Sequence, residues 1–228
     1  MSQVILASSS PRRRELLSTI IAEFASFSPD IDESTDDVIS PYEASGLLAV
    51  RKARTAVAAQ IPFDYLIASD TVVISEGEIL GKPHDRLHAQ EMLMQLRDKA
   101  HEVSTSVAVI SVESGTTKLV ISLVNNLSRV TMRPYSVKEI SSFLDRGEAD
   151  DKAGAYAIQD LEFHPVSECE GCICAVMGLP VQDVVLQLTL ADLDRASILT
   201  PDRIYDRCKD CLRGDFTIEP SNLDDISG

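Results

Sequence analysis

Hydrophobic and polar positions follow two different periods along this chain, and together they predict a mixed α/β fold. Apolar or alternating runs typical of strands lie at 4–7, 24–28, 65–68 continued by 72–74, 103–112, 119–132, 172–176 and in a segment after 159. Apolar residues at helical spacing predict helices from 11 onward, at 41–60, 85–98, 136–146 and 181–193. Because strands and helices do not alternate strictly, we expect a mixed, partly antiparallel central sheet with flanking helices.

A serine loop, Ser8 to Ser10, joins the first expected strand to the first expected helix. Ser10 suits the N-cap and Pro11 the first helical position, and the capping pattern Ser40-Pro41-Tyr42-Glu43 predicts the start of the second helix. Three arginines, 12–14, then fall in the first turn of the first helix, where cations are unfavourable unless an anion binds. Free backbone N–H groups, hydroxyls and guanidinium groups together suit a phosphate. The alternative is a solvated helix start with an accidental basic run.

The bulk composition is that of a globular chain with an acidic balance. Of 228 residues, 44% are hydrophobic and 25% charged, and the net charge is −15. No apolar run is long enough to span a membrane and no signal segment opens the sequence, so we expect a cytoplasmic protein. The negative charge argues against a nucleic-acid surface, and it favours a small anionic ligand at the local basic run. The oligomeric state is not fixed by the sequence, and a homodimer stays open.

Asp70 is the first candidate for chemistry, because it follows the apolar strand 65–68 and is expected at the carboxyl end of that strand, where α/β sites lie. Glu33, in the acidic loop 29–40, would join Asp70 as an oxygen ligand of a divalent cation; alternatively, Asp70 activates water as a general base. Lys52 and Lys82 would neutralise charge in a phosphoryl or nucleotidyl displacement, and Gln159 suits reading a base edge. The plainer interpretations are a capping aspartate, solvated charges and a strand-edge amide.

The five cysteines all lie late in the chain, and two pairs have metal-ligand spacing: Cys169 with Cys172, and Cys208 with Cys211. Cys174 is the fifth. The segment 172–176 reads as a strand, in which alternate cysteines are often plain core residues. A structural metal, a disulfide and free thiols are the three alternatives, and free thiols are favoured.

Short motifs along residues 4–193 resemble the Maf (septum-formation) family in order and spacing. They are Ala7-Ser8-Ser9-Ser10-Pro11-Arg12-Arg13-x-Glu15-Leu16-Leu17, Asp32-Glu33, Lys52-Ala53-Arg54, Ser69-Asp70-Thr71-Val72, Gly81-Lys82-Pro83, Lys152-Ala153-Gly154-Ala155-Tyr156-x-Ile158-Gln159 and Gly178-Leu179-Pro180. The resemblance implies a nucleoside triphosphate pyrophosphatase that cuts between the α- and β-phosphates with Mg²⁺ or Mn²⁺. It also implies an elongated, two-lobed α/β fold similar to inosine-triphosphate pyrophosphatases, with a cleft between the lobes.

The resemblance further implies roles for individual residues. Asp70 matches the family's proton acceptor, with Glu33 and Asp70 as the metal ligands. The other catalytic positions are Lys52 and Lys82. The phosphate-loop positions are Ser8 and Arg13, and the positions linked to substrate choice are Arg12, Thr71 and Gln159.

Arg12, Asp70-Thr71 and Gln159 look like the branch of the family that acts on dTTP and UTP. Two features depart from that branch: Asp160 stands where glycine is usual, and Cys172-Ile173-Cys174 lies in a segment that usually carries Ser or Asn near glycine and an aromatic. Two alternatives are a pyrophosphatase for 7-methyl-GTP or another modified nucleotide, and a nucleotide-binding regulator of cell division with little catalysis. The resemblance covers a predicted domain at 1–193, and 194–228 is expected to be a polar, acidic extension.

Overall fold

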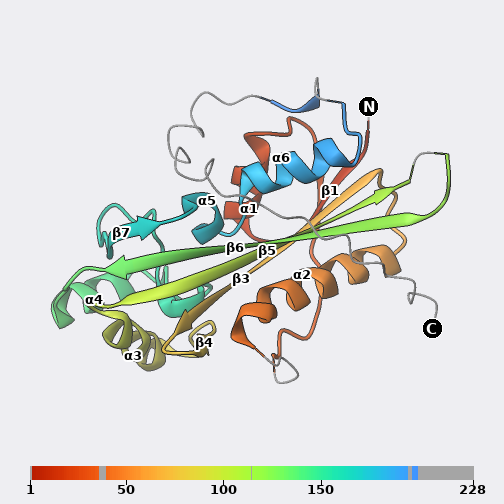
Figure 1. Ribbon diagram of the computed structural model, residues 1–228. Coiled ribbons are helices and arrows are strands. Elements are labelled where there is room, and N and C mark those ends of the chain that lie inside the picture. Colours follow the sequence, from red (N-terminus) through yellow and green to blue (C-terminus); the bar gives the residue numbers. More distant parts are fainter. Residues whose placement is uncertain (1, 36–39, 114, 195–196, 200–228) are drawn as a thin grey trace.

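A computed structural model describes residues 2–35, 40–113, 115–194 and 197–199. Its core is a seven-stranded sheet in the order β2-β1-β3-β5-β6-β7, with β4 paired to β3 (Figure 1). The strands are β1 (Val4–Ala7), β2 (Ala25–Phe27), β3 (Tyr65–Ser75), β4 (Glu78–Leu80), β5 (Ala100–Val112), β6 (Leu119–Met132) and β7 (Val166–Glu170). The helices are α1 (Pro11–Ser18), α2 (Pro41–Ala58), α3 (Arg86–Leu96), α4 (Val137–Leu144), α5 (Ile173–Val176) and α6 (Val181–Leu190), with a 3₁₀ turn η1 (Ala153–Ala155). β1 pairs in parallel with β2 and β3 while the remaining pairs are antiparallel, so the predicted mixed sheet is confirmed.

Three long strands, β3, β5 and β6, form the spine of the molecule (Figure 1). One edge of β3 pairs with β5 from Tyr65 to Ile74. The other edge pairs with β1 only at 65–67 and with β4 only at 73–75. Residues 68–72 of β3 therefore have no strand partner on that second edge within the part of the chain that the structure describes.

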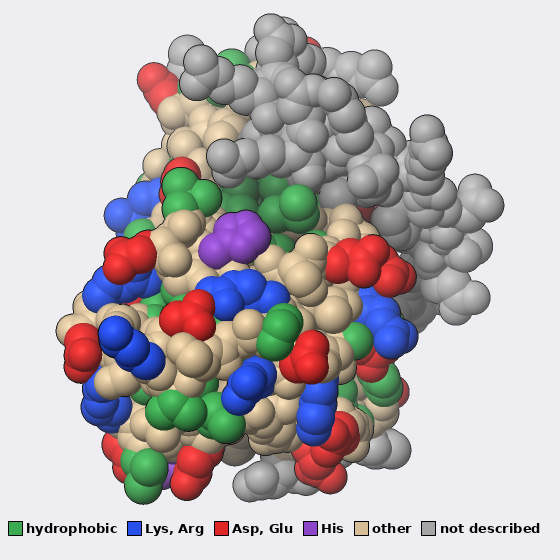
Figure 2. Space-filling view, turned by 90° about the vertical axis from the view of Figure 1, so that its left-hand side faces the viewer, with side chains coloured by type: hydrophobic (Ala, Val, Ile, Leu, Met, Phe, Trp, Pro, Cys, Tyr) green, Lys and Arg blue, Asp and Glu red, His purple; other side chains and the backbone are tan. Residues whose placement is uncertain are grey.

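Apolar side chains gather in separate clusters at the two ends of this spine. At one end, α1, α5 and α6 pack on one face of the sheet and α2 packs on the other. At the other end, α3 and α4 pack with η1, the start of β5 and the end of β6. The surface of that second end carries basic and acidic side chains side by side (Figure 2); Arg86 of α3, for example, pairs with Asp145 beside α4 at 2.8 Å.

The starts of α1 and α4 follow the capping chemistry of their sequences, whereas the start of α2 does not. The Ser10 hydroxyl accepts from the backbone N–H of Arg13 at 3.5 Å, as expected for an N-cap. Ser136 and Glu139 form a full capping box at α4. The capping box expected at Ser40 is wrong, because the Ser40 side chain makes no capping bond, although Pro41 is the first helical residue as predicted.

The expected strand at 172–176 is also wrong. Gly171 has φ +112°, which ends β7 in a turn, and the chain then enters the short helix α5. Cys172 is its N-cap, with Sγ accepting from the N–H of Ala175 at 3.3 Å. Cys169, Cys172 and Cys174 form no disulfide among the described residues, and the last two are buried core residues.

The C-terminal expectations lie largely outside the described residues. Cys208 and Cys211 fall there, as does most of the expected extension, so the domain division stays a prediction. No helix in the described part of the chain has the length and apolar character needed to cross a bilayer.

Candidate active site

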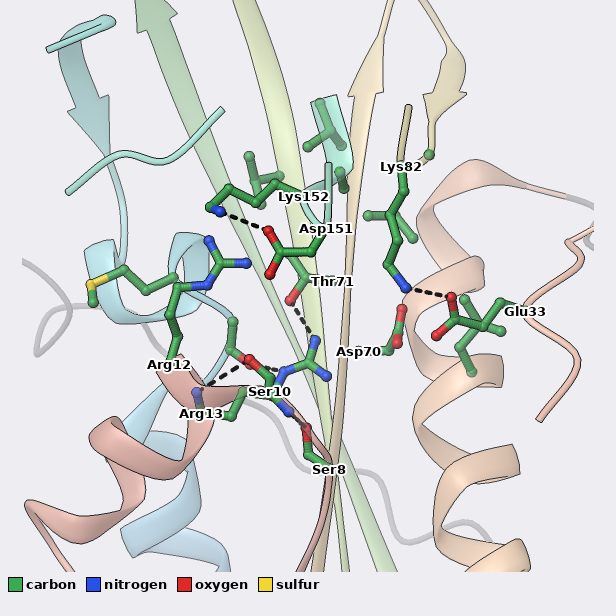
Figure 3. A pocket seen from close by; sticks show the side chains of 18 of the residues that line it. Ser8, Ser10, Arg12, Arg13, Glu33, Asp70, Thr71, Lys82, Asp151 and Lys152 are labelled. Carbon is green, nitrogen blue, oxygen red and sulfur yellow. Dashed lines mark hydrogen bonds and ion pairs between the residues drawn. The ribbon is translucent and has the colours of Figure 1, made fainter. Parts of the chain in front are cut away.

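A cavity of about 550 Å³ opens beside the unpaired stretch of β3 (Figure 3). Its walls come from the loop at 8–13, from α2, from the β4 region and from the segment around η1. Most of the residues predicted for the site line it: Ser8, Arg12, Arg13, Glu33, Lys52, Asp70, Thr71 and Lys82. Five of the lining side chains are basic and three are acidic, namely Arg12, Arg13, Lys52, Lys82 and Lys152 against Glu33, Asp70 and Asp151. In a chain of net charge −15, this balance indicates a local site for an anion.

Asp70 lies in the middle of β3, opposite Ser106 of β5, and not at the carboxyl end of a strand as the sequence suggested. The opening beside Asp70 is made by the ends of the neighbouring strands, since β1 stops at Ala7 and β4 pairs with β3 only from Val73 onward. Alternate residues of a strand point to opposite faces. Asp70 therefore faces α2, while Thr71 faces the side of α1 and α5.

On the α2 face, two carboxylates converge on one buried ammonium group. Lys52 Nζ contacts Asp70 Oδ1 and lies 3.2 Å from Glu33 Oε1. Lys82 Nζ donates to the other Glu33 oxygen, Oε2, at 2.7 Å. Partial burial favours a higher pKa for Glu33, but the hydrogen bond from Lys82 and the charge of Lys52 outweigh it, so the pKa of Glu33 is lowered. The result is a linked chain of alternating charges along one wall.

On the opposite face, Arg13 is held by the loop that precedes α6. Its Nε donates to the carbonyl of Gly178 at 2.9 Å, and its Nη2 donates to Thr71 Oγ1 at 3.2 Å. The hydroxyl of Thr105 also donates to Thr71, at 3.0 Å. Gly178 has φ +111°, and a Cβ there would lie 3.2 Å from the Arg13 Nε, so this close approach requires glycine. Burial lowers the pKa of Arg13, and the charge of Asp70 acts against that shift.

The serine loop shapes the remaining wall. Ser8 is buried, and its hydroxyl accepts from the N–H of Ser10 at 3.1 Å. Ser10 caps α1, so the first turn of that helix points at the cavity with Arg12 and Arg13 beside it (Figure 3). Arg14 is exposed and does not line the cavity.

Two charged lining residues had no predicted role: Asp151 and Lys152, which stand directly before η1. Lys152 Nζ donates to Asp151 Oδ1 at 2.6 Å, beside Arg12 (Figure 3). Burial favours a higher pKa for Asp151, but the hydrogen bond and charge of Lys152 outweigh it, helped by Arg12, and the pKa is lowered. Gly154, with φ +68°, makes the turn and donates its N–H to the Gly81 carbonyl at 3.0 Å. In the sequence, the available sign of these two residues was an acidic and a basic residue shortly before a glycine that makes a turn.

Comparison with known proteins identifies the family of the chain. The family model described as "Maf-like protein" matches residues 3–191. The chain belongs to the Maf family. A protein of Symbiobacterium thermophilum named dTTP/UTP pyrophosphatase is 40% identical over 83% of this chain and 94% of its own length. Proteins of the same name from Salinibacter ruber (40% identity, 85% of this chain and 94% of the relative) and Dehalococcoides mccartyi (38%, 81% and 80%) are similarly close.

In this Maf chain, Gln159 does not line the cavity that holds Asp70. It is exposed and lines a second cavity of about 510 Å³. Arg12 borders both cavities, as do Pro11, Asp151, Lys152 and Ala157, so the two are neighbours. Of the two departures from the family pattern, Asp160 lines the second cavity, whereas Cys172 and Cys174 line neither.

Glu33 and Asp70 are the carboxylates available to a divalent cation on the α2 wall. Within the described ranges, no group of three or more His, Cys, Asp or Glu side chains has metal-binding geometry. The two carboxylates do approach the same Lys52 ammonium, which shows that both point toward one cationic position. Two carboxylates fit Mg²⁺ or Mn²⁺ when phosphate oxygens and water complete the coordination.

Proposed function

We propose that this chain hydrolyses dTTP and UTP between the α- and β-phosphates, giving the nucleoside monophosphate and pyrophosphate. The observation that carries the proposal is the meeting of Glu33 and Asp70 with Lys52, Lys82 and Arg13 in one cavity at the start of α1. The names of the relatives, which cover four-fifths or more of this chain, support the same substrates.

The residues divide into phosphate binders and a base. Ser8, Arg13 and the first turn of α1 bind the triphosphate from one side, and Lys52 and Lys82 bind it from the α2 side. Asp70 takes a proton from the attacking water, whose oxygen forms a bond to the α-phosphorus. The bond from that phosphorus to the bridging oxygen breaks, and pyrophosphate leaves with its charge neutralised by the lysines.

Glu33 and Asp70 would hold Mg²⁺ or Mn²⁺, which supplies further neutralisation of the phosphate oxygens when bound. Lys52 contacts only Oδ1 of Asp70 among the contacts of the described residues, so Oδ2 is left for a cation or a water.

Nucleotide choice is proposed to rest on Arg12, Thr71 and Gln159. Arg12 stands between the two cavities, so a triphosphate bound beside Asp70 can extend its nucleoside past Arg12 toward Gln159. Thr71 acts through Arg13, because its hydroxyl oxygen accepts a hydrogen bond from the Arg13 guanidinium. The two-lobed arrangement like that of inosine-triphosphate pyrophosphatases, a cytoplasmic location and a homodimer stay predictions that belong to the same proposal.

A nucleotide panel tests the function. Pyrophosphate release is measured for dTTP, UTP, 7-methyl-GTP and the common triphosphates with Mg²⁺ or Mn²⁺. We expect dTTP and UTP to have the highest kcat/KM. A higher value for 7-methyl-GTP supports the modified-nucleotide alternative, and tight binding of dTTP without pyrophosphate release supports the regulator.

Asp70→Asn tests the assigned base. The variant is expected to lower kcat by about 10²–10⁴-fold, the usual contribution of a general base, with little change in fold. Asp64→Asn, at an exposed carboxylate just before the same strand, is the matched control and should keep its turnover. Near-wild-type turnover of Asp70→Asn would remove Asp70 from this role.

A further inference from the structure

The turn that carries Gln159 is held by the side chain of the next residue, Asp160. This carboxylate is buried, although it lies in a loop. Oδ1 accepts two backbone N–H groups, from Glu162 at 3.1 Å and from Phe163 at 2.7 Å. Oδ2 accepts from the guanidinium of Arg146, next to the end of α4. Asp160 thereby joins the two sides of a loop. The tip of this loop is Leu161, which is 90% exposed.

Arg146 is itself anchored in the apolar end of the molecule. Its guanidinium carbon lies 5.2 Å from the centre of the Phe143 ring. Phe143 stacks on Phe163 with 4.6 Å between ring centres, and both rings are buried. Because the Phe163 N–H returns to Asp160, these residues form a closed ring of contacts, called here the Arg146–Asp160 clamp.

The clamp lies next to Gln159 and forms part of the same cavity. Arg146, Gln159 and Asp160 all line the second cavity. Apart from the clamp, two backbone hydrogen bonds hold the described residues of this turn: Asp160 N–H to the Ala157 carbonyl at 3.2 Å and His164 N–H to the Asp160 carbonyl at 3.0 Å. A short turn with so few backbone bonds depends on side-chain contacts for a fixed position.

The clamp depends on a buried charged group, the carboxylate of Asp160. Partial burial favours a higher pKa for Asp160, but the hydrogen bond from Arg146 and the two backbone donors outweigh it and lower the pKa. Asp160 therefore stays ionised at neutral pH, and the charged pair persists under working conditions. Removal of Arg146 leaves the buried Asp160 carboxylate without its cation, whereas Arg146 itself also pairs with the exposed Glu162.

We propose that the Arg146–Asp160 clamp positions Gln159 for recognition of the nucleoside, so that this pair tunes which nucleotide the enzyme prefers. The proposal rests on the proposed function. Neither residue of the clamp contacts the reacting phosphates in this scheme, because both lie outside the cavity that holds Asp70. Loss of the clamp should therefore change substrate affinity and preference while the chemical step is retained.

Asp160→Asn is the first test, because it keeps an oxygen for the backbone donors but removes the charge that pairs with Arg146. We expect KM for dTTP to rise about tenfold or more, with kcat within about twofold and a smaller preference for dTTP over the purine triphosphates. Arg146→Lys keeps a cation but not the planar contact with Phe143, and it should show a smaller shift in the same direction. Asp145→Asn is the matched control, because Asp145 directly precedes Arg146 but pairs with Arg86 at the surface. This variant should match the wild type in KM and in nucleotide preference.

Hydrogen–deuterium exchange of the peptide 159–164 tests the clamp apart from catalysis. We expect faster exchange of the Glu162 and Phe163 amides in Asp160→Asn than in Asp145→Asn. If the wild type releases no pyrophosphate, the proposed function fails and the exchange result still decides whether the clamp holds the turn. Unchanged KM and preference in a folded Asp160→Asn, or equal loss of kcat for every nucleotide, would overturn the positioning role. If Asp160→Asn does not fold, the same criteria apply to Arg146→Lys.

Discussion

Replacing Lys52 by methionine should destabilise the fold far more than a surface lysine substitution does. The Lys52 and Asp70 side chains are only 9% and 8% exposed, and methionine keeps the length of the side chain while removing its charge. Asp70 is then a buried carboxylate without its cation, and breaking a buried pair costs about 3–5 kcal/mol. Glu33 is about half exposed and keeps its ion pair with Lys82, so the loss of its contact with Lys52 adds less than about 1 kcal/mol to the destabilisation. Water in the cavity can reach Asp70, and we therefore expect about 3 kcal/mol.

Urea denaturation at pH 7 measures this change. With a slope of about 2 kcal/mol per molar urea, the midpoint of Lys52→Met should fall by about 1.5 M. Lys99→Met is the matched control, because Lys99 forms an exposed pair with Glu76 and should change stability by less than about 1 kcal/mol. The double variant Lys52→Met with Asp70→Asn should recover part of the loss, since no unpaired charge stays buried. Equal midpoints for Lys52→Met and Lys99→Met would refute the reasoning.

Three further predictions address other parts of the site. Gly178→Ala places a Cβ 3.2 Å from Arg13 Nε at φ +111°, so a loss of about 1–3 kcal/mol in a thermal melt and a higher KM for dTTP are expected; an unchanged melting temperature and KM would contradict this. Burial lowers the pKa of His101 to about 4, so the unfolded state binds the extra proton between pH 6.5 and 4, and stability should fall by up to about 3 kcal/mol as pH drops through that window. His101→Gln should flatten that dependence in denaturant titrations at pH 7 and 4.5, and an unaltered slope would show that His101 is not its source. Chelation with EDTA should abolish pyrophosphate release and added Mg²⁺ should restore it, whereas full activity in EDTA would exclude the divalent cation.

Asp70 shows what a hydrophobic pattern can and cannot predict. The apolar run 65–68 identified a buried strand and placed Asp70 at the site. It misplaced the strand end, because Ser69 to Thr71 are polar yet continue the pairing with β5. A polar residue in mid-strand is tolerated here because β1 and β4 leave that edge of β3 open. The end of a strand and its open edge depend on pairing with strands that are distant in the chain, and the local sequence does not show that pairing.

The other departures have similarly non-local causes. The pattern at Cys172 to Val176 suits a strand or a helix, and the positive φ of Gly171 together with the Cys172 cap decides for a helix. From the sequence, Gln159 was expected to read a base edge or to be a strand-edge amide; its position beside a second cavity depends on Asp160 and on packing against α4. Charged residues in motifs were easier to find, because a buried lysine such as Lys52 on the apolar face of a helix is unusual without a partner.

The products of dTTP hydrolysis in ¹⁸O-labelled water with Mg²⁺ test the central claim most directly. Water directed by Asp70 at the α-phosphorus predicts equal amounts of dTMP and pyrophosphate, with the label in dTMP and a rate that falls about 10²–10⁴-fold in Asp70→Asn. Release of dTDP and inorganic phosphate, or label in pyrophosphate, would contradict the account.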